Sequence, residues 1–247
     1  MMKRSGFTLA EVLITLGIIG VVAAMTIPNL IANTNGAKFR SQFKKSISTL
    51  NQAGLMSQAQ YDFDYAGTSA ACSATTATAA AEHPEVTMTF CSILNGTLTG
   101  QTYVGLASNL TRNANGSSMS YSWVRATTIG SPSDYYAYTL ADGSIVGFDT
   151  AAQACELPIG TQLNATVLTT GDLKDCKGFI DVNGVTLPNK EVACGTGATF
   201  SATANVDQPC TVKNDANHMT DVFPIVFHDA TVEPASDAAK YVLTSSK

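Results

Sequence analysis

The chain has 247 residues, of which 45% are hydrophobic and 13% charged, and its formal net charge is −5. The charge is uneven: residues 1–61 carry six Lys/Arg and one Glu, a net +5, and residues 62–247 carry eight Lys/Arg and eighteen Asp/Glu, a net −10. The length is enough for one domain with a sizeable core. The negative charge of residues 62–247 argues against binding to the phosphate backbone of a nucleic acid.

The segment from Phe7 to Met25 is almost entirely apolar and contains one charged residue, Glu11. At about 1.5 Å per residue, a helix of this length crosses most of the ~30 Å hydrocarbon core of a bilayer. A carboxylate in such a segment is costly unless it has a partner, so it marks a functional site. We therefore predict a membrane-spanning helix over about residues 7–27, with basic residues before it that favour a cytoplasmic N-terminus.

The N-terminal sequence Lys3-Arg4-Ser5-Gly6-Phe7-Thr8-Leu9-Ala10-Glu11, followed by the apolar segment and Pro28, resembles the start of type IV pilins and type II secretion pseudopilins. In that family a prepilin peptidase cleaves after the glycine, and the new N-terminal phenylalanine is methylated. The resemblance implies cleavage between Gly6 and Phe7, N-methylation of Phe7, an assembly role for Glu11 and a helix kink at Pro28. It covers about the first 30 residues.

Elementary electrostatics agree with that assembly role. Cleavage after Gly6 leaves an amine on Phe7, about 6 Å of helical rise from Glu11, and neither charge is stable alone in lipid. The Phe7 amine of one subunit and the Glu11 carboxylate of its neighbour can neutralise each other if the two subunits are displaced along the helix axis by about 6 Å. A head-to-tail contact of this kind repeats without closing and builds a helical filament.

Two other interpretations of the N-terminus stay open. Residues 1–24 also read as a conventional signal peptide with a cleavage site at Val22-Ala23-Ala24, which would release a secreted adhesin or binding domain. A plain membrane anchor that never polymerises is the second.

Beyond Pro28 the helix is expected to continue to about residue 62, with a bend or local melting near the proline. Phe39, Phe43, Ile47 and Leu50 form one amphipathic face, which predicts packing under the rest of the chain. The basic cluster of Lys38, Arg40, Lys44 and Lys45 is hypothesised to contact lipid headgroups or acidic neighbouring subunits.

Strand signals dominate the rest of the chain, after a low-complexity loop at residues 67–82. The hairpin Asp134–Phe148, with a turn at Asp142-Gly143, is the clearest. The other predicted strands are Val86–Leu94, Thr102–Ala107, Met119–Thr128, Lys177–Val182, Val222–Phe227 and Tyr241–Thr244.

All six cysteines lie in this part, and an even count beyond an export element predicts disulfides. Six cysteines allow 15 pairings; we favour pairing in sequence order, Cys72–Cys91, Cys155–Cys176 and Cys194–Cys210. A zinc site is disfavoured because closely spaced pairs are missing from the sequence.

Asp181-Val182-Asn183-Gly184 and Asp221-Val222-Phe223 resemble a C-terminal pattern of pseudopilins. Major pseudopilins of type II secretion hold calcium in a C-terminal loop, so the resemblance implies Asp181, Asn183 and Asp221 as candidate oxygen ligands for calcium. The loop departs from an EF-hand, and Asn183-Gly184 makes a tight turn without a metal, so turn chemistry is favoured over calcium. No catalytic motif stands out. His228-Asp229 suggests an acid/base pair, but a loop after a strand explains it more simply.

These observations predict an α+β fold, in which a long kinked helix packs on a mostly antiparallel sheet that carries disulfides. The predicted divisions are a leader (1–6), the helix (7–62) and a periplasmic or extracellular head (63–247). We expect a non-enzymatic subunit of a type II secretion pseudopilus or type IV pilus. It would be held in the bacterial inner membrane with its head in the periplasm, and then enter a filament. Its expected partners are prepilin peptidase, other subunits, an assembly platform and the lipid bilayer, with no nucleic acid.

Overall fold

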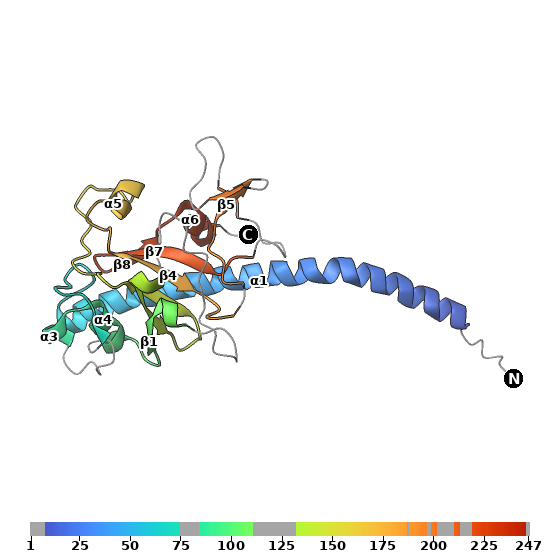
Figure 1. Cartoon of the computed structure of the whole chain (residues 1–247), viewed down its shortest axis with the longest axis horizontal. Coiled ribbons are helices and arrows are strands. Elements are labelled where there is room, and N and C mark those ends of the chain that lie inside the picture. The colour runs from blue at the N-terminus through green and yellow to red at the C-terminus, as the bar shows by residue number, and fades with distance from the viewer. Residues whose placement is uncertain are drawn as a thin grey trace.

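One long helix organises the molecule. The computed structural model describes residues 8–74, 84–110, 132–186, 188–196, 199–201, 210–212 and 219–245. The helix α1 (Leu9–Tyr61) stands clear of the head over its first part and lies along the head over its second (Figure 1). It begins at the N-cap residue Thr8 and ends at Asp62, whose φ of 64° takes the chain out of the helix.

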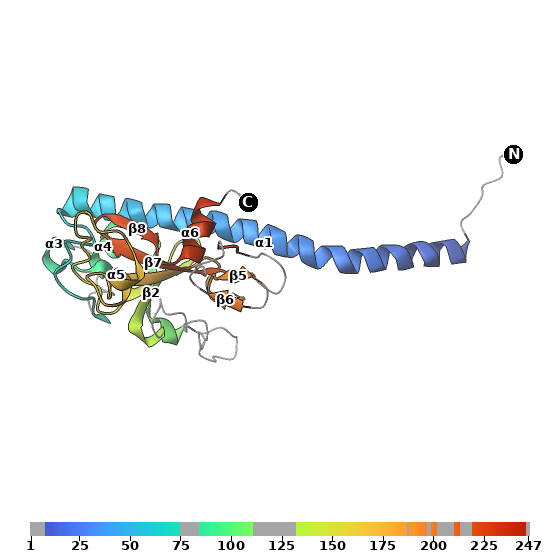
Figure 2. The same cartoon turned by 90° about the horizontal axis from the view of Figure 1, so that it is seen from above.

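The head is built on an antiparallel sheet of six strands in the order β1-β2-β3-β4-β7-β8. Their bounds are β1 (Thr102–Leu106), β2 (Tyr135–Thr139), β3 (Ile145–Asp149), β4 (Lys177–Asp181), β7 (Val222–His228) and β8 (Thr231–Pro234). The small hairpin of β5 (Cys194–Thr196) and β6 (Thr199–Ser201) lies toward the end of the head from which the free part of α1 emerges (Figure 2). The α+β class is thus confirmed.

Short helices surround this sheet. They are α3 (Pro84–Thr87), α4 (Phe90–Thr97), α5 (Ala165–Thr169) and α6 (Asp237–Thr244), with single 3-10 turns at Ala107–Asn109 and Pro132–Asp134. Against α1 lie both α4 and α6, so the long helix contacts the head along most of its second part.

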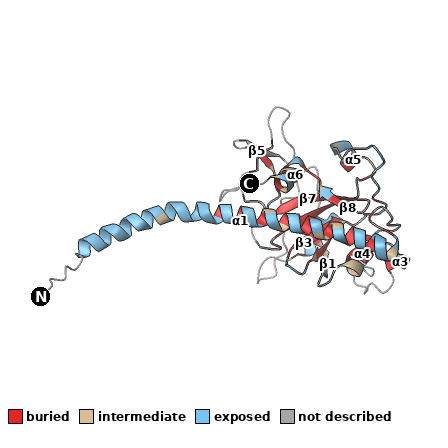
Figure 3. Ribbon diagram, turned by 180° about the vertical axis from the view of Figure 1, so that it is seen from behind, coloured by how far each residue is buried: buried red, intermediate tan, exposed pale blue. Residues whose placement is uncertain are grey.

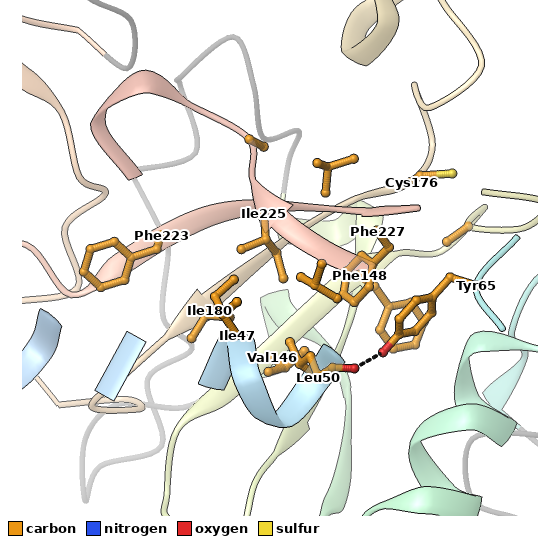
Figure 4. Packing of buried hydrophobic residues seen from close by; sticks show 14 of the residues in the cluster. Ile47, Leu50, Tyr65, Val146, Phe148, Cys176, Ile180, Phe223, Ile225 and Phe227 are labelled. Atoms are coloured by element: carbon orange, nitrogen blue, oxygen red, sulfur yellow. Dashed lines mark hydrogen bonds between the residues drawn. The ribbon is translucent and has the colours of Figure 1, made fainter. Parts of the chain in front are cut away.

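The main core fills the space between α1 and one face of the sheet. The predicted stripe Phe39, Phe43, Ile47 and Leu50 is buried there, and the Phe43 ring stacks on Phe223 of β7 with centroids 4.3 Å apart. Figure 4 shows Ile47 and Leu50 of α1 facing Ile180 and Ile225 of the sheet. A smaller cluster, with Tyr135 and Phe179 in an edge-to-face pair, covers the opposite face.

Close backbone approach fixes where α1 crosses the head. A Cβ on Gly54 would lie 2.7 Å from the carbonyl oxygen of Ala230, in the turn between β7 and β8. The Tyr65 hydroxyl donates to the Leu50 carbonyl over 2.8 Å and ties the segment after α1 back to the helix (Figure 4). The helix and the head therefore share one core.

Most predicted strands are confirmed, including the hairpin. The turn between β2 and β3 places Gly143 at φ +85°, and the Leu140 amide donates to the Ser144 carbonyl over 2.8 Å. The segment 119–128 lies outside the described residues.

Two strand predictions are wrong because helix caps override β-forming side chains. Within 86–94, Thr89 and Ser92 form a capping box that starts α4, and every residue from Phe90 to Leu94 is buried in this helix. Within 241–244 the chain completes α6, which Ser236 starts by accepting a hydrogen bond from the Ala239 amide over 3.2 Å.

Three disulfides join the cysteines in sequence order. They are Cys72–Cys91, Cys155–Cys176 and Cys194–Cys210, closing sequence separations of 19, 21 and 16 residues. The first ties α4 to the chain that leaves α1, and the second joins the loop after β3 to the start of β4. The third joins Cys210 to β5 of the small hairpin.

Candidate functional site

The free part of α1 is the most unusual surface of the molecule. Its large apolar side chains are 45% to 78% exposed, and burial starts abruptly at Ala32, which is 1% exposed (Figure 3). The exposed side chains are Leu9, Val12, Leu13, Ile14, Leu16, Ile18, Ile19, Val21, Val22, Met25, Ile27, Leu30 and Ile31. This stretch is long and apolar enough to cross a membrane, with a mean hydropathy of 2.2.

Glu11 lies in the first turn of α1, inside a capping box with Thr8. One Glu11 carboxylate oxygen, Oε2, accepts from the Thr8 amide and the Thr8 hydroxyl, each over 2.8 Å. The Glu11 amide donates to Thr8 Oγ1 over 3.3 Å. The sequence analysis did not predict the capping role of Thr8, although Thr-x-x-Glu before an apolar run is the signature of such a box. Gly6 and Phe7 lie outside the described residues.

Pro28 is inside an uninterrupted helix. Local melting at this position, one of the two expected outcomes, does not occur: α1 stays helical on both sides and follows a smooth curve (Figures 1 and 2). Pro28 cannot donate to the carbonyl four residues earlier. Nearby side chains make extra contacts with the backbone, since the Thr26 and Thr34 hydroxyls donate to the carbonyls of Val22 and Leu30, each over 3.0 Å.

The basic cluster divides into contacts with the chain's own head and an exposed remainder. The Lys45 ammonium pairs with Asp142 in the β2–β3 turn over 2.9 Å, and the Lys44 ammonium donates to the Ser245 carbonyl after α6 over 3.2 Å. Lys38 is exposed. At least two of the four cations therefore help to orient the head on α1, and contacts with lipid or with neighbours stay a hypothesis.

Asp181, Asn183 and Asp221 come together where β4 ends and β7 begins. Both carboxylates are buried, and the two oxygens of Asp221 accept the backbone amides of Asn189 and Lys190 over 2.8 and 2.7 Å. The amide of Val182 donates to the Asp221 carbonyl over 3.0 Å. The sequence thus identified three residues that the fold does gather.

The electrostatics of this cluster follow from burial. Loss of hydration, and secondly the charge of Asp221, raise the pKa of Asp181 to about 9. Burial also raises the pKa of Asp221 to about 6, although hydrogen bonds from the Lys190 and Asn189 amides and the Asn183 side chain oppose the rise. Glu191, held in the same loop, has its pKa raised to about 8 by burial.

This geometry fits a loop anchor better than a set of calcium ligands. Calcium takes six to eight oxygens, whereas both Asp221 oxygens already face N–H donors. Among the described residues, no group of three or more His, Cys, Asp or Glu side chains is arranged to hold a metal ion. Calcium binding stays a prediction that only a binding measurement tests.

His228 and Asp229 are in contact at the end of β7. The His228 Nδ1 atom lies 2.9 Å from an Asp229 carboxylate oxygen, and the imidazole is nearly buried. Asp229 occupies the turn into β8, with φ 48°, and its amide donates to the Cys155 carbonyl over 2.9 Å. His228 is thus the buried last residue of β7, and the loop that the sequence suggested begins only at Asp229.

Comparison with known families bears on the N-terminal helix. Residues 1–27 match the family model described as the prokaryotic N-terminal methylation motif. The chain carries the prepilin leader of type IV pilins and pseudopilins. No curated protein and no solved structure matches the chain.

The leader supports placing this protein in the type IV pilin-like class. It implies processing by a prepilin peptidase and assembly with other pilin subunits. Together with the long apolar helix, the leader fits an anchor in the inner membrane.

Proposed function

We propose that the chain is a structural subunit of a helical filament, cleaved after Gly6, N-methylated on Phe7 and assembled through α1. One observation carries the proposal: within the part of the chain that the structure describes, the apolar first part of α1 is exposed, in a chain whose residues 1–27 match the methylation motif. Lipid covers such a surface while the subunit waits, and the helices of other subunits cover it in the filament.

Glu11 is the residue we assign to subunit registration. It is fully exposed on α1, one turn from the proposed cleavage point. The amine of a neighbouring Phe7 can therefore reach its carboxylate, in competition with the two hydrogen bonds that Thr8 donates to Oε2. In the bilayer, the unpaired charge of Glu11 is costly because it lies near the hydrocarbon core. Entry into the filament is therefore favoured by pairing this carboxylate with the amine of the neighbouring Phe7.

The removable signal peptide fits the structure less well. Cleavage after Ala24 would cut an unbroken helix and leave its second part, from Ala32 onward, packed on the head without its first part. Within the filament class we favour a type II secretion pseudopilin over a pilus subunit. Two features support this choice. The head is acidic, and the segments around Asp181 and Asp221 resemble a C-terminal pattern of pseudopilins. We expect assembly rather than catalysis as the protein's activity.

The test is Glu11→Gln, which keeps the side-chain shape and removes the charge. The variant is expected to be processed and membrane-bound like the wild type, yet to be missing from sheared filaments. Ser41→Ala, an exposed change on the same helix, is the matched control. Normal filament entry by Glu11→Gln would refute the assigned role.

A further inference from the structure

Charge is segregated along the long axis of the molecule. Residues 29–45 contain four Lys/Arg and no Asp/Glu, whereas residues 46–100 contain four Asp/Glu and no Lys/Arg. The basic segment lies where the free part of α1 reaches the head. The acidic segment includes the end of α1 and α3, at the opposite end of the molecule (Figures 1 and 2).

The end of α1 and α3 form one surface at the far end of the head. The Tyr61 hydroxyl donates to the Gly96 carbonyl over 3.2 Å, and a Cβ on Gly96 would lie 3.1 Å from Pro84, the first residue of α3. Because α3 lies beside the end of α1, the exposed acidic residues Asp62 and Glu85 share this end.

Apolar side chains are exposed beside these acids. Leu55, Met56 and Val86 are 57%, 42% and 77% exposed. Exposed apolar side chains with charged residues around them are typical of a surface that binds another protein. The far end of the head therefore offers an acidic and apolar contact surface.

The basic end of the head offers the complementary combination. Lys44 and Lys45 contact the chain's own head, whereas Lys38 is exposed. Ile31, seven positions before Lys38, is 51% exposed. Seven residues are about two helical turns, so Ile31 and Lys38 lie on one face of α1.

The same spacing recurs at the far end of α1. Asp62 follows Leu55 by seven positions, so these two residues also lie near one face. A second copy displaced by 24 residues (62 minus 38), about 36 Å of helical rise, brings its Lys38 to the level of Asp62. The same displacement brings its Ile31 to the level of Leu55. One displacement thus matches an ion pair and an apolar contact.

We propose that Lys38 of one copy pairs with Asp62 of a second copy, while Ile31 packs on Leu55. This inference rests on the filament proposal and names a contact between its subunits. The displacement of 24 residues is six times the four-residue displacement that joins Phe7 to Glu11, so both contacts fit one filament. Because each copy carries both surfaces, the contact is head-to-tail and repeats without closing.

The test places cysteines at both positions in the full chain, in cells that assemble filaments. Within one copy the two positions are about 36 Å apart, whereas a disulfide needs Cα atoms within about 7 Å, so each link joins two copies. Mild oxidation is expected to convert Lys38→Cys/Asp62→Cys into a ladder of multimers on a non-reducing gel. The control pair Ser48→Cys/Asp62→Cys and each single variant are expected to give no ladder. Ser48 is exposed on α1, but it lies 14 rather than 24 positions before Asp62.

Charge reversal is the second measurement. Lys38→Glu places two acids opposite each other and is expected to lower the yield of sheared filaments at least fivefold. The added change Asp62→Lys is expected to restore the yield, because it restores an opposite pair. The melting temperature of each variant in detergent shows that the head is folded.

Failure of this contact is distinguishable from failure of the filament proposal. Abundant filaments without a ladder, or with a normal yield in Lys38→Glu, would overturn the contact alone and leave Lys38 to another occupant, such as lipid headgroups. A yield that Asp62→Lys does not restore, at an unchanged melting temperature, would also overturn it. A ladder that persists with Glu11→Gln would instead overturn the role of Glu11 and support the contact.

Discussion

Replacement of Phe43 by alanine tests whether α1 and the head share one core. The Phe43 side chain is 0% exposed, and its ring stacks on Phe223 with centroids 4.3 Å apart. Truncation of a buried phenylalanine costs about 3–5 kcal/mol, from lost transfer free energy and the cavity left behind. For a domain of this size, each kcal/mol lowers the melting temperature by about 2–4 °C, so a fall of about 6–20 °C is expected.

The assay is thermal unfolding of the full chain in detergent, followed by near-ultraviolet circular dichroism of the head. Leu55→Ala is the matched control, because Leu55 lies on the same helix but is 57% exposed. The control is expected to shift the melting temperature by no more than about 2 °C. Equal shifts for the two variants would refute a shared core and leave α1 as a stem that only touches the head.

Two further predictions concern carboxylates that are partly or fully buried. Burial raises the pKa of Asp149 to about 6, so the folded state holds its proton more tightly than the unfolded state, and this side chain lowers stability as pH rises from about 4 to about 6. Asp149→Asn retains an acceptor for the Ala151 amide and should flatten the stability–pH curve over that range, whereas parallel wild-type and variant curves in urea unfolding would contradict the assignment. The loop anchor predicts that Asp221→Ala lowers the melting temperature equally in calcium and in chelator, since it removes charge-assisted hydrogen bonds worth about 1.5–3 kcal/mol each. A calcium-dependent rise in melting temperature that Asp181→Ala abolishes would instead establish a metal site.

The long-range organisation was predictable because it rests on strong periodic signals. The apolar run and the stripe from Phe39 to Leu50 repeat one pattern over many residues, and both predict a helix. The Asp142-Gly143 pair is a strong local signal for the turn of a hairpin. Short elements were not, since Thr89 and Ser236 decide α4 and α6 by local capping that β-forming neighbours obscure. The four-residue β8 carries too little pattern to be seen, and its place depends on pairing with β7 and on contact with α1.

The candidate sites divide in the same way. Glu11 and the cleavage segment are contiguous in sequence, so a motif reveals them. The cluster around Asp181 and Asp221 was located from the sequence, but its role was not, because the amides of Asn189 and Lys190 that occupy Asp221 are placed by the fold.

The account depends on a chain that loses six residues and keeps its apolar helix. The N-terminal mass spectrum of the protein recovered from membranes measures this directly. We predict a mature chain that starts at Phe7 and carries one methyl group on its amine. A mature chain that starts at Met25 would contradict the account.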